Sequence, residues 1–331
     1  MEQDGVERVA AGRAVRVRVP AKVNLFLAVR GVRDDGYHEL VTVFQTVGIH
    51  DELTLRLDAA GGVHPALRRF MDVRLRHDAG AGVPDGDENL AVRAARLLLA
   101  HVSGEPDGEH DGLDAPVTDV ELRKTIPVAA GMAGGSADAA GVLVGLNELW
   151  EAGLDRTELR AIGAELGADV PFCVTGGTAL ATGTGTAVAQ VLARGTYHWV
   201  VGMSDEPLST PAVYRAFDEV GTPSEVEPDV VLQALRTGDA EVLGAALHND
   251  LEVAAVHLRP ELGEALDALR AAGALGAIVS GSGPTVVALA ASAEDARRIA
   301  ERTGDRFDRV AVTSSPAGGP EVRHVGHAGG A

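Results

Sequence analysis

A glycine-rich run, Gly131-Met132-Ala133-Gly134-Gly135-Ser136, is the segment of this sequence best suited to binding phosphate. Glycines let a backbone approach an anion closely, and the apolar spacing after the run predicts that a helix begins there. The start of a helix offers free N–H groups and a partial positive charge. A flexible turn in front of an ordinary helix is the alternative, and the run alone does not decide between the two.

Two familiar phosphate loops are excluded. A Walker loop needs Gly-Lys followed by Ser or Thr, and neither lysine of the chain, Lys22 or Lys124, follows a glycine. The Rossmann fingerprint needs G-x-G-x-x-G, and Ala133 stands where its second glycine would be. A phosphate loop at this position therefore belongs to another class.

The net charge of −19 bears on which partners the chain can bind. It argues against nucleic acid and anionic membranes. A phosphate-rich ligand would then depend on local devices: backbone N–H groups, a helix start, a few cations and a metal ion. Only Lys22 and Lys124 among the 29 basic residues are lysines, and a compact ammonium group makes contacts that a guanidinium fork does not.

The composition is typical of a cytoplasmic protein. The single cysteine, Cys173, excludes an internal disulfide and fits a reducing compartment, and its apolar neighbours predict a buried thiol. The polar, acidic N-terminus lacks the apolar core of a signal peptide. No stretch approaches the roughly 18 apolar residues of a membrane span.

Alternating apolar residues predict the strands that must position this chemistry. Valines at every second position over residues 15–19 indicate a half-buried strand. A second strand is expected over residues 22–29, with its apolar side chains on one face. Because successive side chains of a strand point to opposite faces, Lys22 and Asn24 would lie together on the other face.

Strands and helices are expected in two blocks, which predicts an α+β protein of two domains. Capping patterns place helix starts at Asn89, Asp155 and Ser292. Further strands are expected over residues 53–57, 73–75, 117–124, 196–202, 276–280, 285–289 and 309–312. The predicted organisation is a disordered tail over 1–13, domains over 14–175 and 176–313, a disordered tail over 314–331, and surface loops at the polar inserts near 59–70 and 103–116.

Three segments in this order resemble the GHMP kinase superfamily: Pro20-Ala21-Lys22-Val23-Asn24-Leu25, residues 127–140, and Val279-Ser280-Gly281-Ser282-Gly283-Pro284-Thr285. Two others, Asp35-Gly36-Tyr37-His38-Glu39-Leu40 and Gly167-Ala168-Asp169-Val170-Pro171-Phe172, match members that phosphorylate an alcohol linked to cytidine diphosphate. The resemblance implies an α+β, two-domain GHMP kinase fold. Its N-terminal domain would be ribosomal-protein-S5-like, and its C-terminal domain ferredoxin-like with an antiparallel sheet.

The resemblance also implies roles for the matching residues. Lys22 and Asp169 would form the catalytic pair. ATP would be bound by Asn89, Lys124, Pro127, Val128, Ala129, Ala130, Gly131, Met132, Ala133, Gly134, Gly135, Ser136 and Ala137. The acceptor would be bound in the second domain and by the first strands, through Asn24, Tyr37, His38, Thr210, Tyr214, Gly281, Ser282 and Gly283. The co-substrate would be ATP with Mg²⁺, for which Ser136 is a candidate contact, in a monomer or homodimer.

Ordinary structural roles are alternatives for several of these residues. Asp169 precedes Val170-Pro171, where an aspartate often caps a helix, and Lys22 would otherwise be a solvated charge at a strand end. Tyr37 and Tyr214 would otherwise be half-buried rings rather than base-stacking groups. In phosphoryl transfer a protein mainly positions the reactants and stabilises charge. An aspartate that orients the acceptor hydroxyl and a lysine that offsets charge on the transferring group fit that chemistry.

Two other functions stay open. Another GHMP kinase, acting on homoserine or a mevalonate derivative, would carry the same loop, and turnover of the candidate substrates separates them. A catalytically inactive member that only binds nucleotide would lack the lysine, the aspartate or the loop serine. All three are present here.

Overall fold

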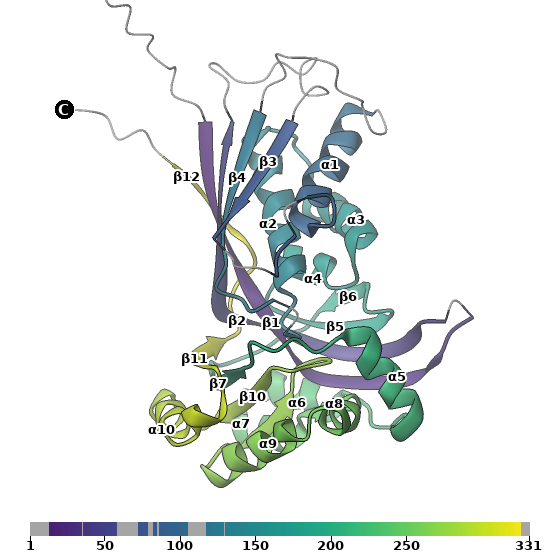
Figure 1. The fold of residues 1–331 in the computed structure, drawn as a ribbon, viewed down its shortest axis with the longest axis vertical. Helices are drawn as coiled ribbons and strands as arrows, with labels where there is room; N and C mark the ends of the chain where they lie inside the picture. The colour runs from purple at the N-terminus through teal and green to yellow at the C-terminus, as the bar shows by residue number, and fades with distance from the viewer. Residues whose placement is uncertain are drawn as a thin grey trace, which may run out of the picture.

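Two β-sheets with helices packed against them form the protein (Figure 1). The computed structural model describes residues 13–34, 36–57, 72–78, 82–84, 86–104, 117–128 and 130–325. The tail predicted before residue 13, the insert near 59–70 and nearly all of the insert near 103–116 lie outside the described residues. The observed α+β arrangement agrees with the prediction.

The larger sheet has the strand order β12–β1–β2–β4–β3, with β5 paired to β2, β6 to β5 and β8 to β1. Most neighbours are antiparallel, but β3 is parallel to β4 and β8 is parallel to β1. The strands are β1 (Arg13–Val32), β2 (His38–Leu57), β3 (Asp72–His77), β4 (Val117–Arg123), β5 (Thr178–Gly183), β6 (Ala187–Gln190), β8 (His248–Asn249) and β12 (Glu321–His324).

The smaller sheet is antiparallel, in the order β11–β7–β10–β9. Its strands are β7 (Tyr197–Met203), β9 (Gly276–Val279), β10 (Val286–Ala290) and β11 (Arg309–Ser315). Three of them lie within one residue of the predicted bounds, and β11 runs three residues further. Successive side chains of β7 point to opposite faces of the sheet. Trp199 and Val201 face a core shared with the larger sheet, whereas Val200 faces a second core.

Helices α1 to α4 cover one face of the larger sheet, and α8 to α10 lie with the smaller one (Figure 1). Their starts follow the predicted capping residues: Asn89 and Ser292 each accept a first-turn N–H, and Asp155 completes a capping box. Within the described ranges, no helix has both the length and the apolarity needed to cross a bilayer. The helices are α1 (Leu90–Ser103), α2 (Gly134–Leu149), α3 (Arg156–Leu166), α4 (Val170–Thr175), α5 (Thr210–Val220), α6 (Asp229–Thr237), α7 (Ala240–Ala246), α8 (Glu252–Leu258), α9 (Glu261–Ala271) and α10 (Ala293–Thr303).

One strand, β1, replaces the two strands predicted over residues 15–29. Its pairing with β2 shifts register between Asn24 and Phe26, so Leu25 is the extra residue of a bulge. The bulge reverses the faces, because Leu25 and Phe26 both enter the first core while Leu27 enters the second. The prediction that the apolar residues of this segment share one face was therefore wrong.

Helix α2 follows the glycine-rich run and packs closely on the larger sheet. A Cβ added at Gly141 would lie 2.7 Å from Leu53 Cδ1, and one at Gly145 would lie 2.2 Å from Leu55 Cδ1. These two glycines are one helical turn apart, so they form the flat surface on which β2 rests. The contact fixes where the N-terminus of α2 stands relative to β1.

Two predicted boundaries differ from the structure. Strands β5 and β6 follow residue 175 but pair with the larger sheet, because β5 runs antiparallel to the first half of β2. The tail predicted to be disordered from residue 314 instead contains β12, which pairs with β1 from Val15↔His324 to Arg18↔Glu321. The alternation in Glu321–His324 was too short to predict this strand.

Candidate active site

A cavity of about 530 Å³ lies where β1 and β2, the glycine-rich run, the start of α4, helix α5 and the turn after β9 meet. Most residues predicted to act in the site line it, together with small and apolar residues that the sequence did not single out. The lining residues are Lys22, Asn24, Leu27, Leu40, Thr42, Phe44, Leu90, Ala130, Gly131, Ala133, Gly134, Gly135, Ser136, Ala168, Asp169, Thr184, Gly185, Thr210, Tyr214, Leu251, Gly281 and Ser282.

The glycine-rich run has the conformation of a tight loop in front of α2. Gly131 has φ 73° and Ala133, the N-cap residue of α2, has φ 56°. A left-handed conformation costs a residue with a Cβ on the order of 1 kcal/mol, and such conformations gather at functional sites. Gly134, Gly135 and Ser136, the first residues of α2, line the cavity, and their N–H groups have no acceptor within the helix. The loop leads directly into a helix, as predicted, and phosphate binding by the run stays a prediction.

Lys124 lies beneath this loop and forms a buried ion cluster. Its Nζ is 2.5 Å from Asp51 Oδ2 and 2.7 Å from Asp138 Oδ2. Asp51 Oδ1 also accepts the N–H groups of Thr125 and Ile126, at the start of the loop. The cluster thus joins β2, the loop and the second turn of α2, and Lys124 does not line the cavity. Its predicted contact with ATP stays a prediction.

The charges in this cluster are unequal. Although burial opposes an ammonium group, the neighbouring carboxylates of Asp138 and Asp51 raise the pKa of Lys124. Burial, with the charge of Asp51, raises the pKa of Asp138 well above its usual value in spite of Lys124. The second oxygen of Asp138 has no hydrogen-bond partner, which adds to the cost of ionising it. Lys124 therefore stays protonated, and its ammonium lies against the start of α2, where a Cβ on Gly134 would be 3.3 Å from Nζ.

Lys22 and Asp169 meet at one wall of the cavity. Lys22 Nζ is 3.5 Å from Asp169 Oδ2 and donates to Asn24 Oδ1 at 2.8 Å. It also lies 5.2 Å from the centre of the Phe44 ring. The Lys22 side chain is 6% exposed, against 31% for Asp169, so the lysine is held by the protein while the carboxylate faces the cavity. Lys22 is not the solvated strand-end charge of the alternative.

Asp169 is the N-cap residue of α4, yet its side chain makes no capping hydrogen bond. The first turn contains Pro171, which has no N–H to be capped. An aspartate is well tolerated at an N-cap position. Because its carboxylate does not cap the helix, it is available to Lys22 and to the cavity. Asp169 thus occupies the N-cap position without capping the helix, and its catalytic role stays a prediction.

Tyr214 lies at the other end of the cavity, whereas His38, which stacks on it, does not line the cavity. The His38 ring stacks on Tyr214 at 4.9 Å, and His38 Nε2 lies 2.8 Å from Asp218 Oδ1 on the same helix α5. Burial raises the pKa of Tyr214, and the charge of Asp169 adds to the effect, so the phenol stays neutral. Tyr37 is 69% exposed and does not line the cavity. Thr210 at the start of α5 shares a hydrogen bond of 2.8 Å with Ser282.

The remaining predicted residues lie around the cavity rather than on its wall. Asn89 is buried as the N-cap of α1 and donates to the Pro84 carbonyl. The predicted residues that do not line the cavity also include Pro127, Val128, Met132, Ala137 and Gly283; Ala129 lies outside the described residues. Cys173 is buried, as predicted, and burial raises the pKa of its thiol.

Sequence reasoning missed several residues that the structure brings to the site. Asp51 begins the alternating Leu53–Leu57 pattern and carries no further signal. Asp218 lies four residues after Tyr214, a spacing that puts both on one helical face, so it could have been found. Leu251, Thr184 and Gly185 come from segments with no motif.

Known proteins provide an independent comparison. Residues 89–177 match the family described as GHMP kinases N terminal domain, and residues 231–308 match GHMP kinases C terminal. The chain is 45% identical over 317 residues to the 4-diphosphocytidyl-2-C-methyl-D-erythritol kinase of Mycolicibacterium smegmatis, covering 93% of this chain and 92% of that protein. It is 51% identical over 305 residues to the enzyme of the same name from Salinispora tropica, covering 90% of each.

Solved structures agree. A crystal structure of 4-(cytidine 5'-diphospho)-2C-methyl-D-erythritol kinase matches with a TM-score of 0.72 at 35% identity, covering 92% of this chain and all of that one. A homoserine kinase from Cytophaga hutchinsonii matches with a TM-score of 0.69 at 20% identity, covering 98% of this chain and all of that one. At that identity the second match supports the fold alone.

Proposed function

Since the chain belongs to the GHMP kinase family, we propose that it transfers the γ-phosphate of ATP to the 2-hydroxyl of 4-diphosphocytidyl-2-C-methyl-D-erythritol, a step of isoprenoid precursor synthesis. The observation that carries this proposal is the identity of 45–51% to enzymes of that name over at least 90% of the chain. The cavity supports it, because the glycine-rich run, the Lys22–Asp169 pair and Tyr214 line one space.

In this proposal, Asp169 receives the acceptor hydroxyl. The hydroxyl oxygen forms a bond to the γ-phosphorus while the bond from that phosphorus to the β–γ bridging oxygen breaks, and ADP leaves with that electron pair. Asp169 orients the hydroxyl and takes its proton late in the step. Lys22, held by Asn24, keeps the carboxylate in place and offsets charge on the transferring group.

The N-terminus of α2 would hold the ATP phosphates. Gly134, Gly135 and Ser136 line the cavity, and the buried ammonium of Lys124 lies close to Gly134. Because the chain carries a net charge of −19, ATP binding would depend on such nearby N–H groups and on this ammonium. We propose the same segment for ATP that the sequence predicted.

Ser136 is the group of this chain that fits a magnesium ion carried in with ATP. The described residues contain no cluster of three or more His, Cys, Asp or Glu side chains for a metal. Magnesium in kinase sites keeps several waters and is bound largely by substrate phosphates with one or two protein oxygens, usually carboxylates, so the Ser136 hydroxyl would be one of its ligands. When bound, the ion would neutralise phosphate charge.

The aromatic end of the cavity would take the cytosine base. Tyr214 and the His38 ring present flat surfaces, and Asp218 holds the orientation of His38. Tyr37, exposed at the hairpin between β1 and β2, could close over the base from the other side. Homoserine and mevalonate have no base to stack here, and the identities above do not favour those substrates. A cytoplasmic location and the oligomeric state stay predictions.

Release of ADP, measured in a coupled assay with ATP, Mg²⁺ and the cytidine substrate, tests the function. We expect turnover by the wild type and a fall in kcat on the order of 10²–10⁴ for Asp169→Asn, because the variant loses the proton acceptor. Asp239→Asn is the matched control, an N-cap aspartate on α7 remote from the cavity. Wild-type turnover no higher than that of Asp169→Asn would disprove the proposal. Faster turnover of homoserine or mevalonate than of the cytidine substrate would identify the chain as another GHMP kinase.

A further inference from the structure

The turn at residues 280–283, between β9 and β10, lies against Lys22, Asn24, Gly131 and Thr210. A Cβ on Gly281 would lie 3.2 Å from Asn24 Oδ1 and 3.6 Å from Lys22 Nζ. A Cβ on Gly131 in the phosphate loop would lie 2.2 Å from the carbonyl oxygen of Ser280. Ser282 bonds to Thr210 on α5. The position of this turn therefore affects the catalytic lysine, the phosphate loop and the acceptor side together.

Asn249 holds this turn from behind. Its Nδ2 donates to the carbonyl oxygens of Val279 and Gly281, both at 2.8 Å, and its Oδ1 accepts the N–H of Leu251 at 3.0 Å. The side chain is buried, and both N–H groups of its amide are used. Asn249 does not line the cavity and would touch neither substrate.

The backbone of Asn249 is itself fixed to the catalytic strand. It belongs to β8, which pairs in parallel with β1 through Phe26↔His248 and Leu27↔Asn249. The side chain of Asn249 therefore sets the distance between β1, which carries Lys22, and the turn that packs on it.

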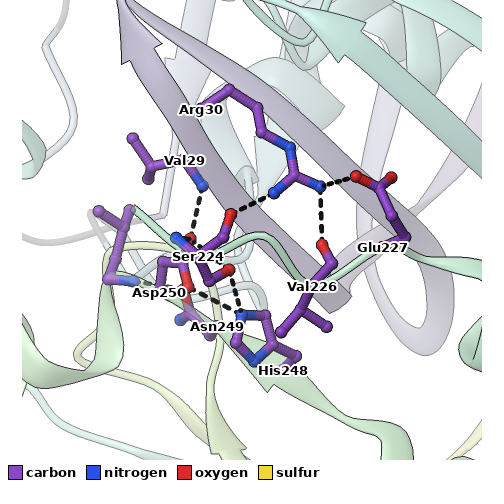
Figure 2. A network of polar contacts seen from close by, with 9 residues as sticks. Val29, Arg30, Ser224, Val226, Glu227, His248, Asn249 and Asp250 are labelled. Atoms are coloured by element: carbon purple, nitrogen blue, oxygen red, sulfur yellow. Dashed lines mark hydrogen bonds and ion pairs between the residues drawn. The ribbon is translucent and has the colours of Figure 1, made fainter. Parts of the chain in front are cut away.

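The next residue, Asp250, reinforces this attachment, as Figure 2 shows. Its Oδ2 accepts the N–H of Val29 on β1 at 2.8 Å and the hydroxyl of Ser224 at 3.0 Å, and its Oδ1 lies 2.8 Å from His248 Nε2. Arg30 on β1 donates to the carbonyl oxygens of Ser224 and Val226. The segment that follows α5 is thus tied to the same part of β1.

We infer that Asn249 is a positioning residue for phosphoryl transfer, which holds the 280–283 turn against Lys22, Asn24 and the phosphate loop. This inference rests on the proposed function. A displacement of reacting groups by about 1 Å can cost on the order of 10²-fold in rate, so a residue that acts only through the turn can affect kcat strongly. Substrate contacts made elsewhere in the cavity would be retained.

The variant Asn249→Asp tests the inference, because a carboxylate has nearly the same shape but cannot donate to two carbonyl oxygens. We expect kcat to fall at least about tenfold, with KM for ATP and for the cytidine substrate within about threefold of wild type. Asn147→Asp is the matched control: Asn147, at the end of α2, also bridges backbone groups, those of Leu154, but lies away from the turn. It is expected to lose stability and keep kcat.

Thermal unfolding of both variants separates misfolding from misplacement. If Asn249→Asp does not fold, Asn249→Ser, which introduces no charge, takes its place under the same criteria. A kcat within threefold of wild type, a loss confined to KM, or failure of both variants to fold would each overturn the inference. These outcomes are distinct from failure of the proposed function, in which the wild type itself would not turn over the substrate.

Discussion

Several side chains in this protein support the proposed site by holding a neighbouring residue in place. Lys22 depends on Asn24 for its position, and the loop above α2 depends on the buried ammonium of Lys124. The sequence singled out Lys22, Asp169 and Ser136, which we propose to act in the reaction, because they occur in motifs. Their supporting residues could not, because Asp51 and Asn249 become partners only after strands far apart in sequence pair.

Asp250 supports a prediction about pH at this scale. Although burial opposes its charge, hydrogen bonds from His248, the Val29 N–H and Ser224 lower the pKa of Asp250. A carboxylate whose pKa is lower in the folded than in the unfolded protein stabilises the fold at pH values above its unfolded pKa. That contribution is lost as the pH falls through the pKa of the folded state. We expect Asp250→Asn to lower the free energy of unfolding by about 2 kcal/mol at pH 7, and by less as the pH falls below about 4.

Urea unfolding from pH 7 to pH 3 measures this difference. Asp267→Asn, on the exposed surface of α9, controls for the loss of one carboxylate, since 81% of its side chain is accessible. A difference between wild type and Asp250→Asn that grows toward acid pH would show that the hydrogen bonds in Figure 2 do not stabilise the charged form.

At the scale of elements, alternating apolar residues and capping residues predicted most strands and helix starts. They did not predict the irregular backbone of the β-bulge in β1. Capping residues located the starts of α1, α3 and α10. The bulge at Leu25 was hidden, because an alternating sequence fits either face and only pairing with β2 decides where the extra residue goes. Its effect is functional, since the bulge follows directly after Asn24.

Close packing between α2 and the larger sheet leads to a second prediction. Replacing Gly145 by alanine gains about 1 kcal/mol of helix propensity but places a Cβ 2.2 Å from Leu55 Cδ1. Overpacking costs about 1–3 kcal/mol, so we expect net destabilisation of about 1 kcal/mol in denaturant unfolding. Gly263→Ala on α9 meets only Val256, at 3.2 Å or more, and should be neutral or stabilising. Equal effects of the two substitutions would argue against a packing constraint.

At the scale of the whole molecule, the two sheets are joined by a buried polar contact. The Ser315 hydroxyl accepts from the Trp199 indole of the smaller sheet at 2.7 Å and donates to Gln45 Oε1 of the larger sheet at 2.5 Å. No local pattern predicted it, because its three members lie on β2, β7 and β11. The pairing of β5 and β6 with the larger sheet was missed for a related reason: the chain returns to that sheet after residue 175.

This contact can be tested by Ser315→Ala. The substitution leaves a buried indole N–H and a buried amide oxygen without their partner, at a cost of about 1–3 kcal/mol each. We expect a lower urea midpoint, while Ser314→Ala, an exposed neighbour on β11, should change little. Unfolding followed by tryptophan fluorescence measures both. A Ser315→Ala variant as stable as Ser314→Ala would mean that another group satisfies Trp199.

The pairing of β12 with β1 also constrains how the protein is made. A ribosome releases β1 first and β12 after every other described strand, at about 5–20 residues per second. For many seconds of synthesis, the outer edge of β1 from Val15 to Arg18 has no strand beside it. The nascent chain thus carries an open template for unwanted strand addition until its last strand emerges. The arginines at positions 16 and 18 along that edge would discourage such pairing during the wait.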